Sequence, residues 1–321
     1  MARIGRFAAV LALLTFASVA QAQEYPNHLI KMLLGFPPGG NVDTIARVMT
    51  AEMAKGLGQQ FVVENKPGLA GNFAAEAVAH APPDGYTLLI LASAHPAAAA
   101  VQKNLKFKPV DDFAWLSTVS FYPFVLTVRK DSKYKSVADI VAAARANPRG
   151  VSFGSAGVGS ILHMAAELLG RDAGVQFVHV PYRGEAFAIT GLMTGDVDFV
   201  ISTPTPVLPH VKSGALRALA VTGKTRWQRM PDTPTIQEGG IKDYEVISWT
   251  GFAAPAGTPR PIVNKLNAEI HRVIGLPAIK AKLESLGGDV TGTTPEEMRD
   301  LVARQLALWT RVARESHIQV Q

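Results

Sequence analysis

Two glycine-rich stretches of the chain could bind an anion through backbone amides. The first is GFPPGGNVD at residues 35–43, and the second is GSAGVGS at residues 154–160. Adjacent glycines in the first stretch leave no Cβ atoms to keep a ligand from the backbone. The next amides open a predicted helix, where they lack intrahelical partners and favour negative charge, so this stretch can receive an anion. The alternative is a simple turn in which Asn41 or Asp43 caps the helix.

Strand and helix patterns place these stretches in loops. An apolar run at 29–34 has the length of a strand, and apolar residues at 45–57 recur every fourth position, as on one face of a helix. The rest of the chain follows the order β, α, β, α with short connections. This order predicts parallel sheets with helices on both faces.

The loops at the predicted strand ends fall into two groups. One group lies at 35–43 and 92–96, and the other lies at 154–160, 181–185 and 202–204. In open α/β sheets, ligands bind beyond the carboxyl ends of the strands. Two groups of loops on two domains therefore predict a ligand cleft between the domains.

Several catalytic patterns are present only in part. The second glycine-rich stretch has the spacing of a phosphate-binding loop, but Ser160 and Ile161 replace its lysine and its Ser or Thr. Phe153 replaces the first glycine of a nucleophile elbow. His163 and Glu167 lie one helical turn apart without a third ligand, which favours a simple contact over a metal site. We therefore predict no catalytic residue, no metal site and no cofactor.

The first 22 residues resemble a secretory signal. Arg3 and Arg6 precede an apolar run at 7–16, and small residues at 20–22 form a cleavage site. The run ends too early to span a bilayer. A mature chain starting at Gln23 would be long enough for two domains.

Charge and cysteine content narrow the class of protein further. The formal net charge is +6 and falls to +4 without the signal, and the basic residues are scattered, so nucleic-acid binding has little support. The absence of cysteine excludes disulfides, thiolate metal sites and the anchor of a lipoprotein. We expect a protein that diffuses freely in a periplasm.

Eight short motifs in a fixed order make the chain resemble the Bug family, the extracytoplasmic solute receptors of tripartite tricarboxylate transporters. The motifs are PPGGNVDTIAR at 37–47, ENKPG at 64–68, DGYTLL at 84–89, GSAGVGS at 154–160, VPYRG at 180–184, PHVKSGALRALAVT at 209–222, PDTPTIQEGG at 231–240 and APAGTP at 254–259. The resemblance runs from Tyr25 to about Ile318.

The resemblance implies a two-lobed α/β periplasmic binding protein of type II. Each lobe would be a mostly parallel sheet flanked by helices, with the ligand cleft between the lobes. One lobe would comprise residues 23–122 plus 246–321, and the other residues 123–245. A monomer would close over a small carboxylate, such as an organic, amino or aromatic acid, and deliver it to a membrane permease.

The family's cleft loops correspond to a set of predicted ligand-binding residues. On the first lobe these are Phe36, Gly39, Gly40, Asp43 and Ser93, and on the second Ser155, Gly157, Gly159, Ser160, Tyr182, Arg183, Gly184 and Thr203. Two positions depart from the family pattern. Gly35 replaces a common proline, which we expect to loosen the loop, and Glu185 replaces a small or hydroxylated residue. We expect Glu185 either to pair with an amino or amide group of the ligand or to cap its helix.

Two other functions remain open at this point. A sensor would present its ligand to a signalling receptor instead of a permease, and no motif separates the two. An enzyme on the same scaffold would need a base, for which only Asp43, His95 and Glu185 qualify.

Overall fold

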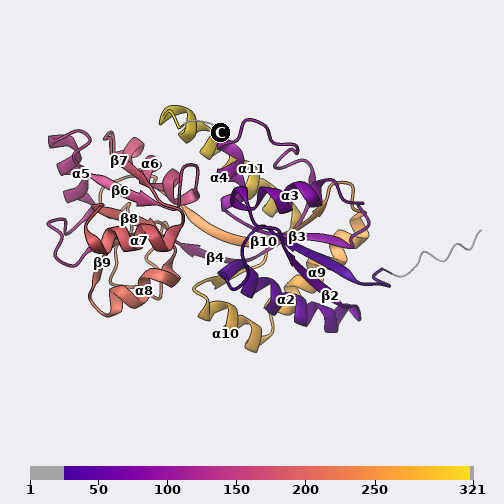
Figure 1. Cartoon of the computed structure of the whole chain (residues 1–321). Coiled ribbons are helices and arrows are strands. Elements are labelled where there is room, and N and C mark those ends of the chain that lie inside the picture. The colour runs from indigo at the N-terminus through magenta and orange to yellow at the C-terminus, as the bar shows by residue number, and fades with distance from the viewer. Residues whose placement is uncertain (1–24, 319–321) are drawn as a thin grey trace, which may run out of the picture.

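The computed structural model describes residues 25–318, so the expected signal segment at 1–22 lies outside the described residues. The chain forms two lobes, each built on one sheet with helices on both faces (Figure 1). The predicted two-lobed α/β fold is therefore confirmed, but the sheets, predicted to be mostly parallel, are both mixed. No helix between residues 25 and 318 combines the length and the apolar character that crossing a membrane requires.

The sheet of lobe 1 has the strand order β11-β4-β10-β3-β1-β2. Its strands are β1 (Ile30–Leu34), β2 (Phe61–Asn65), β3 (Thr87–Ala92), β4 (Phe113–Pro123), β10 (Ile247–Pro255) and β11 (Asp289–Val290). β1 pairs in parallel with β2 and β3, whereas β10 runs antiparallel to β3 and β4. The sheet is mixed because the chain re-enters it from lobe 2 through β10.

Helices cover both faces of this sheet. They are α2 (Asn41–Leu57), η1 (Leu69–Gly71, a 3₁₀ turn), α3 (Asn72–Ala79), α4 (Ala94–Val101), α9 (Arg260–Ile274), α10 (Pro277–Ser285) and α11 (Pro295–Glu315). Successive residues of β1 face opposite sides. Met32 and Leu34 accordingly pack with α2 and α9, while Leu33 packs with α3 and α11.

The sheet of lobe 2 has the strand order β7-β6-β8-β5-β9. Its elements are β5 (Val125–Arg129), α5 (Val137–Ala146), β6 (Ser152–Ser155), α6 (Ile161–Ala173), β7 (Val178–Pro181), α7 (Glu185–Thr194), β8 (Phe199–Ser202), α8 (Pro204–Lys212) and β9 (Leu216–Val221). β6 pairs in parallel with β7 and β8, and β5 runs antiparallel to β8 and β9. The core on one face packs α5 and α6, and the core on the other packs α7 and α8.

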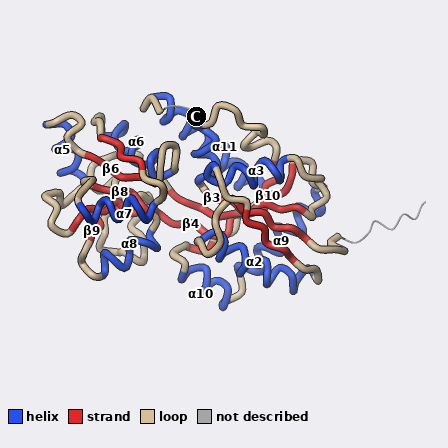
Figure 2. The backbone as a smooth tube through the Cα atoms, viewed as in Figure 1, coloured by secondary structure: helices blue, strands red, loops and turns tan. Residues whose placement is uncertain are grey.

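Two extended segments connect the lobes (Figure 2). β4 ends in the lobe 1 sheet at Pro123, and β5 begins in the lobe 2 sheet at Val125. On the return, the Val246 amide donates to the Thr222 carbonyl in lobe 2, and β10 starts at the next residue. The expected lobe boundaries lie beside these crossings and stay a prediction.

The C-terminal helix joins the lobes on one side of these crossings. Val302 of α11 packs in a core cluster of lobe 1, whereas Trp309 and Val312 pack in the main core cluster of lobe 2. Val101 of α4 belongs to the same lobe 2 cluster. Residues that follow β10 in the chain thus stabilise both lobes.

One predicted loop is shorter than expected. The segment at 92–96 was expected to be a loop, but α4 already begins at Ala94. Its sequence AHPAAAAV is rich in alanine, the strongest helix former. Pro96 is tolerated because amides in the first turn have no intrahelical partner to lose.

Candidate functional site

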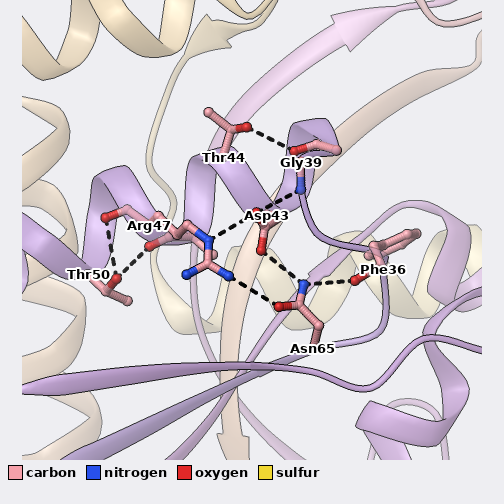
Figure 3. A network of polar contacts seen from close by, with 9 residues as sticks. Phe36, Gly39, Asp43, Thr44, Arg47, Thr50 and Asn65 are labelled. Carbon is pink, nitrogen blue, oxygen red and sulfur yellow. Dashed lines mark hydrogen bonds and ion pairs between the residues drawn. The ribbon is translucent and has the colours of Figure 1, made fainter.

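A buried carboxylate holds the loop between β1 and α2 in place (Figure 3). Asp43 accepts hydrogen bonds from the Gly39 amide and from Nε of Arg47, each at 3.0 Å. Nδ2 of Asn65 donates to Asp43 at 2.9 Å and to the Phe36 carbonyl at 3.0 Å. The Arg47 hydrogen bond is the main cause that lowers the pKa of Asp43 to about 2. Asp43 therefore fixes the loop rather than presenting free oxygens to a ligand.

The start of α2 is open to a ligand. Its N-cap is Gly40, and no side chain caps this helix. Uncapped amides at a helix N-terminus form an anion site, because the donors and the helix dipole act together. Behind the loop, Gly35 approaches η1 so closely that a Cβ atom would lie 2.1 Å from Cα of Gly71. The glycine at position 35 thus fits a close backbone contact that fixes the loop from behind.

Hydroxyl groups surround the second helix start of lobe 1. Ser93, the N-cap of α4, is buried, and its Oγ lies 2.9 Å from Oγ of Ser248 on β10. The Tyr122 side chain contacts both Ser248 and Asn41, the first residue of α2. Burial raises the pKa of Tyr122, while these two contacts lower it. Hydroxyls from β4, β10 and α4 therefore meet beside the open start of α2.

A second cross-strand pair on the same face carries two more buried hydroxyls. Ser120 and Thr250 are partners across β4 and β10, two positions along from Tyr122 and Ser248. Within residues 25–318, the hydroxyls of Ser120 and Thr250 have no hydrogen-bond partner. Buried polar groups are normally satisfied, often by water. These two buried hydroxyls are thus unpaired polar groups in the strands that carry Tyr122 and Ser248.

The glycine-rich loop of lobe 2 is held by its own side chains. The Ser155 hydroxyl donates to the Gly157 carbonyl and accepts from the Gly157 amide, both at 3.1 Å. Ser160 caps α6 by accepting from the His163 amide at 3.2 Å. The Gly159 amide donates to Nδ1 of His163 at 3.1 Å. These groups, predicted to bind the ligand, are therefore engaged within the loop itself.

Two stacked histidines support this loop. The rings of His163 and His179 lie 3.7 Å apart, and Nε2 of His179 lies 2.6 Å from the Ser155 hydroxyl. Burial, and then the neighbouring His163, lowers the pKa of His179 to about 3. The predicted contact of His163 with Glu167 is confirmed at 3.5 Å. The support by His179 was missed, since no spacing rule connects β7 with α6.

The three predicted residues at the start of α7 differ in position. Tyr182 packs under α7, where a Cβ atom on Gly191 would lie 2.1 Å from the tyrosine hydroxyl. Arg183 is exposed, and Gly184 is the N-cap of α7, which no side chain caps. Tyr182 therefore supports α7, and the uncapped start of α7 is accessible to a ligand. Ligand binding by these three residues stays a prediction.

Glu185 connects the starts of two helices. It is the first residue of α7, and its carboxylate accepts hydrogen bonds from the backbone amide of Thr203 and, at 2.9 Å, from the Thr203 hydroxyl. Thr203 is the N-cap of α8. Burial raises the pKa of Glu185, and the two hydrogen bonds lower it. Glu185 therefore binds the N-cap residue of α8 rather than capping its own helix.

The two lobes approach each other around this group of residues. The Glu185 carboxylate of lobe 2 is close enough to add to the raised pKa of Tyr122 in lobe 1. The Thr205 hydroxyl of α8 donates to the Leu286 carbonyl at 3.2 Å, where Figure 1 shows α8 and α10 near each other. The helix starts of α2 and α4 thus face those of α7 and α8 across the junction of the lobes.

Two surface hollows lie elsewhere. One of about 690 Å³ is lined by α5, α6 and the end of α11, and one of about 600 Å³ lies along α11. None of the predicted ligand-binding residues lines either hollow. In the part of the chain that the structure describes, no group of three or more His, Cys, Asp or Glu side chains is arranged to hold a metal ion.

The chain is similar to proteins of one receptor family. Residues 45–318 match the family described as tripartite tricarboxylate transporter family receptor. A protein of Pseudomonas sp. strain P51, named UPF0065 protein in tcbD-tcbE intergenic region, is 37% identical over 318 residues. The match covers 97% of this chain and 95% of that protein.

Two solved structures with carboxylates have the same fold. R. palustris Rpa4515 with adipate has a TM-score of 0.80 and 34% identity, and the match covers 92% of this chain and 99% of that chain. MatC from Rhodopseudomonas palustris with bound malate has a TM-score of 0.77 and 33% identity, with 90% and 99% covered.

Proposed function

The chain belongs to the tripartite tricarboxylate transporter family of receptors, and from this membership we propose that it binds a small carboxylate between its lobes and delivers it to a membrane permease. The resemblance to the Bug family predicted from the motifs is confirmed. The family is one of periplasmic solute-binding proteins. Export through the segment before Gln23 and action as a monomer are parts of the proposal.

The open start of α2 is the observation that carries this proposal. A carboxylate placed there would meet backbone amides without displacing any side-chain cap. Charge-assisted hydrogen bonds of this kind contribute roughly 1.5 to 3 kcal/mol each. The hydroxyls of Ser93, Tyr122 and Ser248 lie beside it and supply further donors. A carboxylate can therefore bind here without an arginine or lysine.

Similar receptors support the chemical class of the ligand. Rpa4515 is found with adipate and MatC with malate, and both compounds are small organic acids. We propose the same class, organic acids of low molecular weight, for this chain.

The engagement of the candidate bases favours a receptor over an enzyme. Asp43 accepts hydrogen bonds from three groups of the chain itself. His95 is buried among Phe107, Phe113 and Trp115, and burial lowers its pKa to about 4. Of the three candidate bases, only Glu185 is both partly exposed and close to Tyr122 across the lobe junction.

Thermal unfolding of ligand-free protein against a panel of organic acids tests the proposal. A ligand at about a hundred times its dissociation constant should stabilise the fold by roughly 2.7 kcal/mol. The midpoint should rise by several degrees for one class of acid. A panel without any shift, on protein that is well folded, would contradict carboxylate binding.

A pair of Tyr→Phe variants locates the site. Tyr122→Phe removes a hydroxyl beside the start of α2 and should reduce the ligand-induced shift. Tyr134→Phe is the matched control, because the Tyr134 hydroxyl is buried in lobe 2 without a hydrogen-bond partner within residues 25–318. Equal loss of binding in both variants would place the ligand elsewhere. Delivery is tested separately, by uptake into vesicles that contain the permease.

A further inference from the structure

Glu185 occupies a position that is built to hold an anion. The start of α8 offers a backbone amide and a hydroxyl on the same residue, Thr203. A carboxylate that accepts from both donors at a helix N-terminus has the arrangement that a bound ligand carboxylate would have. Here the carboxylate belongs to the chain itself. The donors of Thr203 are therefore already used.

The charge of Glu185 is not neutralised by a cation of the chain. Between residues 25 and 318, its hydrogen bonds come from Thr203, and no Lys or Arg forms an ion pair with it. Arg183 lies two residues away but is exposed. A second carboxylate brought close to Glu185 in a partly dehydrated site would be repelled.

Glu185 also lies near the place where the ligand is expected. Its carboxylate acts on the Tyr122 hydroxyl, which contacts Asn41 at the open start of α2. The side chain is only partly buried, so its remaining lone pairs can accept a further hydrogen bond. A ligand held by lobe 1 would thus point its far end towards an acceptor.

We propose that Glu185 takes the place of a second ligand carboxylate, so that this receptor selects acids with one carboxylate and an uncharged or hydrogen-bond-donating far end over dicarboxylates. The inference rests on the proposed carboxylate binding and adds the class of acid. A monoamide keeps the length of a dicarboxylate but presents an NH₂ donor in place of a charge. Monoamides should therefore bind in preference to their parent diacids.

Calorimetric titration of matched acids tests this selectivity. The probes are succinate with succinamate, adipate with its monoamide, and butyrate with hexanoate. In the unchanged protein, the best monoamide or monocarboxylate should bind at least about tenfold more tightly than its diacid. In Glu185→Gln the charge is lost and the shape is kept, so the ratio of monoamide affinity to diacid affinity should fall towards one. In Glu185→Ala the donors of Thr203 are freed, so diacids should gain about tenfold or more.

The control is the same substitution at an exposed glutamate. Glu296→Gln removes a carboxylate that pairs with Arg260 on the surface of lobe 1, and it should leave the ratio unchanged. If diacids bind the unchanged protein as tightly as their monoamides, or if Glu185→Gln alters stability without altering the ratio, the inference is wrong while the proposed function stands. If no acid of the wider panel binds, the proposed function itself fails.

Discussion

The starts of α2 and α4 in lobe 1 are open, whereas three of the four helix starts in lobe 2, those of α5, α6 and α8, are bound by side chains of their own lobe. In lobe 1, no side chain caps α2 or α4. In lobe 2, Ser160 caps α6, and Glu185 binds the N-cap of α8. Only α7 begins without a cap there. Both lobes have the same arrangement of strand, loop and helix, yet in lobe 2 only α7 keeps its first amides for an external anion.

This difference assigns separate tasks to the two lobes. An anion gains most where donors are unpaired, which is the start of α2. Lobe 2 offers acceptors and a loop satisfied by its own groups, so it can shape the site around an uncharged end of the ligand. The support of each loop also differs, since a carboxylate holds the loop of lobe 1 and two imidazoles hold that of lobe 2.

The largest effect is expected from removing the carboxylate that supports lobe 1. Asp43→Ala leaves the Gly39 amide, Arg47 and Asn65 without their shared acceptor. We expect a loss of about 2 to 4 kcal/mol in the free energy of unfolding. Ligand binding should weaken at least about tenfold, because the start of α2 would no longer be held in place. Urea unfolding and calorimetric titration measure the two effects.

An exposed aspartate provides the control for this substitution. Asp131 pairs with Arg129 at the surface of lobe 2, and Asp131→Ala should change stability by less than about 0.5 kcal/mol. Similar losses in both variants would mean that the Asp43 network contributes no more than a surface ion pair.

A smaller effect is expected where the lobe 2 loop touches lobe 1. Gly159 has φ +74°, and a Cβ atom there would lie 2.5 Å from Cγ2 of Val101 on α4. Gly159→Ala should therefore destabilise the protein by about 1 to 3 kcal/mol. Adding Val101→Ala should recover about 1 kcal/mol relative to the sum of the single changes. Thermal unfolding of the four proteins gives this coupling.

Gly174 separates backbone strain from the contact between lobes. It has φ +64°, and a Cβ atom there would meet nothing within 4 Å. Gly174→Ala should therefore cost only the strain of a positive φ, roughly 1 kcal/mol, and Val101→Ala should not relieve it. A loss at Gly174 equal to that at Gly159 would show that Val101 is not the obstacle.

Local patterns predicted the fold and the loops well, because periodicity and turn residues act over a few positions. They placed a strand at 29–34 and a helical pattern at 45–57, where the structure has β1 and α2, although α2 already begins at Asn41 inside the predicted loop at 35–43. The partners that decide what each loop does lie far along the chain. Asn65 reaches back to Asp43 from β2, and Tyr122 meets Ser248 only through the pairing of β4 with β10.

Because these partners lie far along the chain, two residues have roles that the local loop pattern does not predict. Asp43 lies in a loop that matches an anion site, but its oxygens are used by the loop itself. Glu185 was expected to meet the ligand or to cap α7; it binds the N-cap residue of α8 rather than capping α7, and its contact with the ligand stays a prediction. Neither outcome follows from spacing, since each depends on which segments the folded sheets bring together.

Acidification should weaken the lobe 2 loop before the lobe 1 loop. His179 has its pKa lowered from an ordinary 6.5 to about 3, so the unfolded chain binds a proton that the folded chain excludes. The stabilisation from neutral His179 is therefore lost as the pH falls from about 6.5 towards 3. Asp43 has its pKa lowered from 3.8 to about 2, so its stabilisation is lost only between those lower values.

The smallest effect is therefore the part of the pH slope that His179 contributes. Urea unfolding between pH 7 and 5 should show stability falling with acid by at most about 1.4 kcal/mol per pH unit for this one proton. His179→Gln should reduce the slope by this amount, because Gln does not titrate, and the buried His95 of lobe 1 should keep its own contribution. His80→Gln, at an exposed histidine of lobe 1, should leave the slope unchanged. Hydrogen exchange, corrected for its own pH dependence, should show that residues 155–160 lose protection as the pH falls from 7 to 5, while residues 39–47 keep theirs. Equal loss in both loops would mean that the two supports do not differ in their response to acid.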